Sequence, residues 1–303
     1  MVETTQNQEL LHPYNARLFI KREDLIHPYI SGNKYRKLKY NIAFAKANNY
    51  KALLTFGGAY SNHIAATAAA GKAYNFKTIG VIRGEELGTD IERTLESNET
   101  LARASADRMD FKFISRELYK QKETPSFLEV LRKEFPDTYI LPEGGTNDLA
   151  IKGCEEILSP EDASFDYVCC AVGTGGTISG VINASHSVQK VIGFPALKGD
   201  FLKSEIQKWV KTSNWGLQHD YHFGGYAKVT EPLVDFMNDF KKKNMITLDP
   251  VYTGKMMYGI FDLLSKGYFP QNCRILAIHT GGLQGIAGMN KKLKKKGLQT
   301  IDD

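Results

Sequence analysis

The sequence lacks the cysteine patterns of metal-binding and disulfide-linked proteins. Its four cysteines form no CxxC pair, and two of them, Cys169 and Cys170, are adjacent in an apolar segment. Neither a structural zinc site nor a disulfide framework is supported. His219 and His222 are spaced as metal ligands can be, but no third ligand accompanies them. We therefore expect no metal, and a solvated strand around these two histidines.

Long uncharged apolar runs are absent as well. None reaches the roughly 18 residues that a membrane-spanning helix needs. The first ten residues carry Glu3 and Glu9, unlike a signal peptide. We therefore expect a soluble, cytoplasmic protein without a membrane partner. With 42% hydrophobic and 24% charged residues the composition is ordinary for a globular protein, and 303 residues suggest one or two domains.

The small positive charge comes from 39 Lys and Arg against 34 Asp and Glu. Much of the excess lies in two lysine runs, at 241–243 and 291–296, which are not interleaved with aromatic residues. Both runs fall near the ends of helical patterns, where cations favour the helix dipole. We interpret them as solvated helix ends and expect no nucleic-acid partner.

Runs rich in Val, Ile and aromatic residues alternate with helical patterns over most of the chain. This alternation predicts an α/β fold with parallel sheets covered by helices on both faces. Two sheets are expected. The expected strands are 17–21, 52–56, 78–82, 111–114, 139–141, 167–172, 191–194 and 274–279. The expected helices are 34–48, 62–74, 91–106, 126–134, 148–158, one after Gly176, 201–210, 232–242, 255–265 and a final one.

A glycine-rich turn, GTGGT at 173–177, joins the strand 167–172 to a helix. Its backbone N–H groups and the helix N-terminus favour a phosphate. A dinucleotide fingerprint would need glycine where Ile178 stands, and a P-loop would need lysine after Gly180, where Val181 follows. The turn therefore indicates a phosphate site of another kind, or a tight strand–helix turn without a ligand.

Two further turns follow expected strands. GGAYSNH at 57–63 opens an alanine-rich helix, where Ser61 or Asn62 is suited to cap the helix, or the helix start receives a carboxylate. HTGG at 279–282 either lets a ligand approach the backbone or simply ends a strand. Because ligands bind at the carboxyl ends of parallel strands, the three turns together indicate a ligand site.

Lys34 follows a small-residue bend at the start of a helix. Alone it could be an ordinary surface lysine, but a phosphate site with a lysine that burial keeps partly neutral is what a pyridoxal phosphate enzyme needs. The chain resembles the tryptophan-synthase-β-like (fold type II) pyridoxal-phosphate enzymes, in the branch of 1-aminocyclopropane-1-carboxylate (ACC) deaminase and D-cysteine desulfhydrase. The matching segments, in family order, are KRED (21–24), GNKYRKL (32–38), GGAYSNH (57–63), GTGGT (173–177), DPVYTGK (249–255) and HTGG (279–282).

The resemblance implies a two-domain architecture in which each domain is a largely parallel twisted sheet flanked by helices. A smaller domain, residues 38–145, is nested within a larger one formed by residues 1–37 and 146–303. Pyridoxal 5′-phosphate occupies the cleft between the domains, and the protein is a homodimer.

The resemblance also implies roles for residues around the cofactor. Lys34 forms the Schiff base with the cofactor aldehyde, and Thr253 and Thr280 lie beside the pyridine nitrogen. The cofactor phosphate is held by Lys37 together with the backbone of Gly173, Thr174, Gly175, Gly176 and Thr177.

Other residues are implied to meet the 3′ oxygen of the cofactor or the substrate. Asn62 hydrogen-bonds the 3′ oxygen, while Ser61 and its helix start hold the substrate carboxylate. Tyr252 and Tyr226 face the substrate. His63 either tunes the substrate pocket or caps the helix.

Two threonines decide between the reactions of the branch. The deaminase pattern has glutamate where Thr253 stands and leucine where Thr280 stands, whereas both threonines match the desulfhydrase. A carboxylate favours a protonated pyridine and a strong electron sink. A hydroxyl binds the ring nitrogen without fixing its charge, which suffices for a thiolate leaving group. The alternative is that both threonines only pack beside the ring.

We therefore expect β-elimination from D-cysteine or a close relative, giving pyruvate, ammonia and hydrogen sulfide. Lys34 is the leading candidate for the base, Ser61 is its rival, and Tyr252 could assist the leaving group. The alternatives are ACC deamination, another pyridoxal-phosphate-dependent lyase or racemase reaction on an amino acid, and a non-catalytic binding scaffold.

Overall fold

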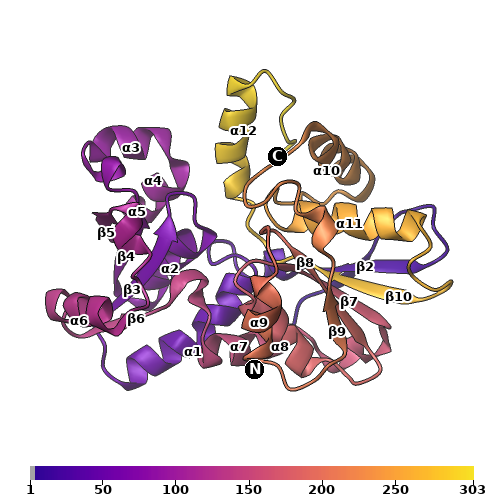
Figure 1. Ribbon diagram of the computed structural model, residues 1–303, viewed down its shortest axis with the longest axis horizontal. Helices are drawn as coiled ribbons and strands as arrows, with labels where there is room; N and C mark the ends of the chain where they lie inside the picture. The colour runs from indigo at the N-terminus through magenta and orange to yellow at the C-terminus, as the bar shows by residue number, and fades with distance from the viewer. Residues whose placement is uncertain (1–3) are drawn as a thin grey trace.

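Two parallel-rich sheets organise the chain in the computed structural model, which describes residues 4–303 (Figure 1). The large sheet has the order β1-β2-β10-β7-β8-β9, and only β1 runs antiparallel to its neighbour. Its strands are β1 (Asn7–Glu9), β2 (Arg17–Lys21), β7 (Tyr167–Val172), β8 (Lys190–Pro195), β9 (Trp215–Leu217) and β10 (Arg274–Ile278). The small sheet, β5-β4-β3-β6, is wholly parallel. Its strands are β3 (Ala52–Gly58), β4 (Lys77–Arg83), β5 (Met109–Ile114) and β6 (Thr138–Ile140).

Helices flank both sheets, and the predicted α/β fold class is confirmed (Figure 1). The α-helices are α1 (Asn33–Ala47), α2 (Asn62–Tyr74), α3 (Ile91–Ser97), α4 (Glu99–Ala106), α5 (Arg116–Tyr119), α6 (Pro125–Glu134), α7 (Asp148–Glu155), α8 (Gly176–Ala184), α9 (Phe201–Gln207), α10 (Glu231–Asn244), α11 (Thr253–Ser265) and α12 (Gly285–Lys295). Short 3₁₀ helices lie at η1 (Glu23–Leu25), η2 (Glu85–Gly88), η3 (Glu143–Gly145), η4 (Pro160–Ser164) and η5 (His219–Tyr221). Among residues 4–303, no helix combines the length and apolar character needed to cross a membrane.

The burial of β7 explains why its sequence is apolar throughout. Val168 and Val172 belong to the core cluster under α8, whereas Cys169 and Ala171 belong to the cluster under α10 and α11. Successive side chains of a strand point to opposite faces, so a strand covered on both faces has no polar alternation. The turn after β7 is therefore anchored to a rigid central strand of the large sheet.

Two expectations about elements were wrong. The expected helix 91–106 is two helices, because Asn98 is extended and its side chain accepts from the Leu101 N–H to begin α4. The expected solvated strand around His219 and His222 is the 3₁₀ helix η5, which Tyr221 anchors by donating a hydrogen bond to Asp262. Both lysine runs do lie in the last turns of helices, α10 and α12.

Buried ion pairs hold the segment KRED at 21–24 in place. Lys21 pairs with Asp162 of η4 at 2.8 Å, and both side chains are almost fully buried. Glu23 receives two hydrogen bonds of 2.9 Å from the guanidinium of Arg36, in a pair that is fully buried. Charge-assisted fork-like pairs of this kind fix geometry as well as charge. KRED thus ties β2 to η4 and to α1, the helix that carries Lys34.

The strands of the small sheet come from residues 52–140, and those of the large sheet come from the chain on either side. Helix α1 extends from 33 to 47 and so crosses the predicted domain boundary at residue 38. It contacts α7, and the side chain of Asn147 donates to that of Asn41 across this contact. The boundaries 38 and 145 stay a prediction, and residues 1–3 of the predicted large domain lie outside the described residues.

Candidate active site

A cavity of about 640 Å³ opens between the two sheets. It is lined by the turns that follow β3, β7 and β10, together with two lysines from the first turns of α1. Its volume suits a ligand of cofactor size. The three glycine turns singled out in the sequence therefore meet at one place, as their positions after parallel strands predict.

The cavity brings together most of the residues implied by the resemblance. Gly176 and Thr253 do not line it. The predicted residues that do are Lys34, Lys37, Ser61, Asn62, Gly173, Thr174, Gly175, Thr177, Tyr226, Tyr252 and Thr280.

Lys34 is placed by a close contact between α1 and the turn after β10. Gly32 precedes the helix with a φ of +57°, and a Cβ there would lie 1.9 Å from the carbonyl oxygen of Thr280, so only glycine fits. The amine of Lys34 donates to the carbonyl of Gly144 at 3.3 Å. Burial, and then the charge of Lys37, hold the pKa of Lys34 well below its ordinary value. A lysine with a lowered pKa is a ready nucleophile or base.

Lys37 lies one turn further along α1 and faces the start of α8. Its amine donates to the carbonyl of Gly144 at 2.9 Å and to the hydroxyl of Thr146 at 3.0 Å, and burial lowers its pKa. A Cβ on Gly176 would lie 3.1 Å from this amine. Gly175 turns the chain into α8 with a φ of +88°. The amine and the first N–H groups of α8, which have no acceptor within the helix, form a cradle suited to an anion.

The turn after β3 opens α2 with Ser61 as its cap. The hydroxyl of Ser61 accepts from the N–H groups of His63 and Ile64, so Ser61 is the residue that caps α2, and a carboxylate at this helix start stays a prediction. Asn62 also lines the cavity, and its side-chain carbonyl accepts from the amide of Gln284 at 3.0 Å. The first turn of α2 is therefore capped by Ser61, while the Asn62 side chain is directed to another element.

His63 lies on the cavity, and its ring does not cap the helix. The residue is 2% exposed, and neither ring nitrogen has a hydrogen-bond partner among the described residues. A Cβ on Gly145 would lie 2.7 Å from it. Burial, with the charges of Lys34 and Lys37, holds the pKa of His63 well below its ordinary value, so the ring is neutral. A neutral imidazole offers one donor and one acceptor.

Tyr226 and Tyr252 form an edge-to-face pair in the wall of the cavity, with ring centroids 6.2 Å apart. Burial, followed by the neighbouring Tyr226 and Asp249, holds the pKa of Tyr252 well above its ordinary value, and burial also raises the pKa of Tyr226. Both phenols therefore remain protonated near neutral pH. They can donate hydrogen bonds or a proton to a ligand but do not serve as bases there.

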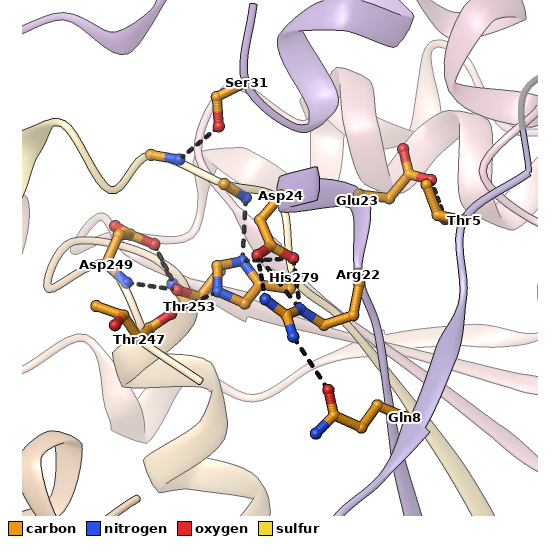
Figure 2. A network of polar contacts seen from close by, with 12 residues as sticks. Thr5, Gln8, Arg22, Glu23, Asp24, Ser31, Thr247, Asp249, Thr253 and His279 are labelled. Atoms are coloured by element: carbon orange, nitrogen blue, oxygen red, sulfur yellow. Dashed lines mark hydrogen bonds and ion pairs between the residues drawn. The ribbon is translucent and has the colours of Figure 1, made fainter. Parts of the chain in front are cut away.

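The two threonines occupy different environments. Thr253 is fully buried, and its hydroxyl donates to the carboxylate of Asp249 at 2.6 Å, a contact visible in Figure 2. Asp249 also accepts from the backbone N–H groups of 251–253, which lead into α11. Thr280, by contrast, lines the cavity at the end of β10. Of the two, Thr280 is thus the hydroxyl that a ligand can reach.

His279 supports the turn that carries Thr280. Its Nε2 lies 2.7 Å from the carbonyl oxygen of Thr247, while Nδ1 accepts from the N–H of Gly281 at 3.2 Å (Figure 2). The imidazole thus braces the turn after β10 against the segment that precedes α11.

The cavity contains residues that the sequence analysis missed. Asn33 donates to the hydroxyl of Thr177 at 2.8 Å and so joins α1 to α8. Arg83 ends β4, Glu143 follows β6, and Lys292 comes from α12. Glu143 begins the segment EGG, a glycine pair just after an expected strand, which is the signal that located the other three turns. No comparable sequence signal marks Lys292.

Comparison with known proteins identifies the class. A family model described as pyridoxal-phosphate dependent enzyme matches residues 4–281. The chain therefore belongs to the pyridoxal-phosphate-dependent enzymes, with the fold type II architecture, and pyridoxal phosphate is its cofactor. Within that class it belongs to the family of ACC deaminases and D-cysteine desulfhydrases, which act on small amino acids.

Three similar proteins support this family assignment. A protein of Pyrococcus horikoshii with the provisional name 1-aminocyclopropane-1-carboxylate deaminase is 31% identical, over 92% of this chain and 88% of its own length. The bifunctional D-cysteine desulfhydrase/1-aminocyclopropane-1-carboxylate deaminase of Arabidopsis thaliana, a mitochondrial protein, is 31% identical over 90% and 74%. The crystal structure of an ACC deaminase homologue has a TM-score of 0.82 at 30% identity, covering 97% of this chain and 94% of its own.

The residues of the cavity fit this cofactor. The cradle of Lys37 and the α8 N-terminus suits its phosphate, and Lys34 provides an amine of lowered pKa within the same cavity. Gly175 has a positive φ, and a Cβ on Gly176 would crowd the amine of Lys37. Because neither residue has a side chain, the space before α8 stays open for an anion. The expected homodimer stays a prediction.

Proposed function

We propose that the protein eliminates the β-substituent of D-cysteine to give pyruvate, ammonia and hydrogen sulfide. The observation that carries this proposal is the hydroxyl of Thr280 at the end of β10, on the cavity wall. Among the described residues that line the cavity, Glu143 is the only carboxylate, and it is held by Tyr119 at 2.7 Å and Lys122 at 3.2 Å. A hydroxyl without a carboxylate suits a substrate with a good leaving group, such as thiolate.

In this proposal Lys34 carries the cofactor, which when bound supplies the electron sink for charge at the substrate α-carbon. Once the substrate amine has taken its place on the cofactor, the freed amine of Lys34 would take the α-proton, and its lowered pKa supports Lys34 over Ser61 as the base. Ser61 and the start of α2 hold the substrate carboxylate, and Asn62 meets the 3′ oxygen. Tyr252, a protonated phenol, donates to the departing sulfur.

The phosphate is assigned to the end of the cavity near α8. Lys37 and the backbone at 173–177 hold it, and the buried amine of Lys37 already lies next to Gly176. Tyr226 lies beside Tyr252 and borders the substrate.

The proposal is tested by substrate turnover. Purified enzyme loaded with pyridoxal phosphate is incubated with D-cysteine, L-cysteine, L-serine and ACC in parallel. Pyruvate (from cysteine or serine), 2-oxobutanoate (from the four-carbon ACC) and sulfide are measured. We expect equal amounts of pyruvate and sulfide from D-cysteine, and little from the other three. Turnover of ACC alone would contradict the proposal, and loss of optical activity without pyruvate would indicate a racemase.

A second candidate, ACC deamination, is favoured by the names of several relatives, including that of the Bradyrhizobium diazoefficiens protein, which is 27% identical. The same assay separates the two reactions, since sulfide is formed only from cysteine.

The attachment of the cofactor is tested separately. Borohydride reduction of the loaded enzyme followed by peptide mapping is expected to place the pyridoxyl group on Lys34. A label on any other lysine would overturn the site assignment. A purified protein that stays colourless with added pyridoxal phosphate would indicate a non-catalytic scaffold.

A further inference from the structure

Helix α12 joins the large sheet to the wall of the small one. It follows β10 of the large sheet, yet it contacts α4, and Lys291 pairs with Glu99 of that helix at 2.7 Å. Figure 1 shows α12 between α10 and the helices that cover the small sheet. A helix that follows a strand of the large sheet and contacts a helix covering the small sheet can set the position of residues on the far side of the cavity.

One face of α12 meets the turn before α2. Gln284 immediately precedes α12, and its side-chain amide donates to Asn62. A Cβ on Gly288 would lie 3.2 Å from the ring of Tyr60, and the Lys292 ammonium lies 4.4 Å from the centre of that ring. Positions 284, 288 and 292 recur every four residues, as neighbours on one helix face do. This face therefore aligns with the turn that carries Ser61 and Asn62.

The hydrogen bond from Gln284 determines which way the Asn62 amide points. A side-chain amide has a carbonyl that accepts and an NH₂ that donates, on opposite sides. Because Gln284 donates to Oδ1 of Asn62, the NH₂ group is the end left for other contacts. That NH₂ packs against Gly282, where a Cβ would lie only 2.7 Å from it, and Gly282 lines the cavity.

The helix that carries Asn62 does not fix this orientation itself. Ser61 caps α2 by accepting from two backbone N–H groups, so the Asn62 side chain has no part in the cap. Among residues 4–303, the hydrogen bond from Gln284 is the only one made by the Asn62 side chain. The orientation of the amide thus depends on a residue from the other side of the cleft.

We propose that Gln284 is a positioning residue that holds the Asn62 amide with its N–H donor toward the 3′ oxygen of the cofactor. The inference rests on the proposed function, in which Asn62 meets that oxygen. A reversed amide would present its carbonyl to another oxygen, and two facing acceptors repel each other. Gln284 therefore contributes to cofactor affinity without touching the cofactor.

The test uses two variants of Gln284 with opposite hydrogen-bonding character. Gln284→Glu keeps the shape but replaces the donor with an acceptor, which favours the reversed Asn62 amide. Gln284→Met removes the donor without adding an acceptor. Titration of the cofactor-free proteins with pyridoxal phosphate is expected to show affinity lowered about tenfold for Gln284→Glu, with a shifted visible absorption band of the bound cofactor, and lowered only a few-fold for Gln284→Met.

The control is Lys291→Ala, which breaks the ion pair between α12 and α4 without touching Asn62. It is expected to leave both the affinity and the absorption band unchanged. If it reproduces the effect of Gln284→Glu, general loosening of the cleft is the cause and the proposal is wrong.

A double-mutant cycle separates positioning from direct repulsion of the cofactor by the new carboxylate. In an Asn62→Ala background, Gln284→Glu is expected to lower affinity no further. An undiminished effect there would overturn the proposal. If wild-type protein binds the cofactor at Lys34 and Asn62→Ala weakens it while Gln284→Glu does not, only the role of Gln284 fails. If wild-type protein does not bind at Lys34, the proposed function fails as well.

Discussion

At the scale of single residues, the site is distinguished by two amines and an imidazole that are buried away from water. Lys34 and Lys37 both donate to the carbonyl of Gly144, and the neutral ring of His63 lies beside them without a partner among the described residues. Each of these groups is less stable here than in water. These groups therefore lower the free energy of unfolding of the cofactor-free protein, and a bound ligand would give them hydrogen-bond partners.

The first prediction concerns Lys34 and the stability of the cofactor-free protein. Because its folded-state pKa is lowered, the unfolded chain binds more protons at this residue. The free energy of unfolding therefore rises with pH from the lowered pKa up to the ordinary value of about 10.4. We expect Lys34→Met to raise that free energy by about 1 kcal/mol at pH 7 and to flatten its pH dependence.

Urea unfolding of the cofactor-free protein between pH 6 and 9 measures this effect. Lys133→Met, at a highly exposed lysine, is the matched control and is expected to change little. Destabilisation by Lys34→Met at every pH would contradict the prediction.

The second prediction concerns Thr280, the hydroxyl on the cavity wall. Thr280→Val keeps the shape and removes the hydroxyl, so the proposed contact with the pyridine nitrogen is lost. We expect kcat with D-cysteine to fall about tenfold or more, since a hydrogen bond of about 1.5 kcal/mol is removed from the transition state. Steady-state kinetics of the loaded enzyme measures this, and an unchanged kcat would mean that Thr280 only packs beside the ring.

At the scale of elements, those with a strong internal pattern were predictable. The strand 167–172 and the helix 62–74 were placed with their observed ends, because an unbroken apolar run and an alanine-rich helix with a cap leave little choice. The strands β1 and β9 were missed. Each has three residues at an edge of the large sheet, and their conformation depends on pairing with β2 and β8 more than on their own sequence.

The residues of the site divide in the same way, into those that a sequence pattern locates and those that packing places. Residues in glycine turns after strands were predictable because topology gathers such turns at one edge. Lys292 was not, because it reaches the cavity only through the packing of α12. Gln284 was not either, because it contacts Asn62 through the same packing and does not line the cavity itself. The hydroxyl of Thr253 was expected beside the cofactor, a role that stays a prediction. Its bond to Asp249 depends on the local geometry at the start of α11, which sequence spacing does not reveal.

The third prediction concerns the start of α8. A Cβ on Gly176 would lie 2.7 Å from the hydroxyl of Thr146 and 3.1 Å from the amine of Lys37. Gly176→Ala is therefore expected to displace Lys37 and to lower the affinity for pyridoxal phosphate about tenfold, the loss of one charge-assisted hydrogen bond. Gly216→Ala, where a Cβ meets nothing within 4 Å, is the control. Equal affinities of the two variants would argue against the phosphate cradle.

At the scale of the whole molecule, the cavity depends on contacts that hold α1 to the large sheet. Arg36, on α1, makes a fully buried pair with Glu23, while Lys34 and Lys37 on the same helix line the cavity. The ion pairs of KRED thus fix the lysines by fixing their helix. KRED, a segment shared with the family, contributes no residue to the cavity wall, and its role is to hold α1 in place.

The fourth prediction tests this support. Arg36→Met leaves the carboxylate of Glu23 buried without its cation, which is expected to lower the free energy of unfolding by about 3–5 kcal/mol. Arg17→Met breaks an exposed pair with Glu9 and is expected to cost far less. Urea unfolding of both variants measures the difference, and similar costs would contradict the structural role of KRED.

The four cysteines are all free and buried in the cores of the fold. Burial raises the pKa of Cys154 to about 11 and that of Cys170 to about 12, and it raises those of Cys169 and Cys273 as well. Their thiols are therefore protonated and covered, and the thiolate is the reactive form. Hydrosulfide forms a persulfide only with a cysteine that is already oxidised, for example a sulfenic acid, with loss of water. Because these thiols are protonated and covered, they resist that first oxidation, and the hydrosulfide of the proposed reaction would find no oxidised cysteine here.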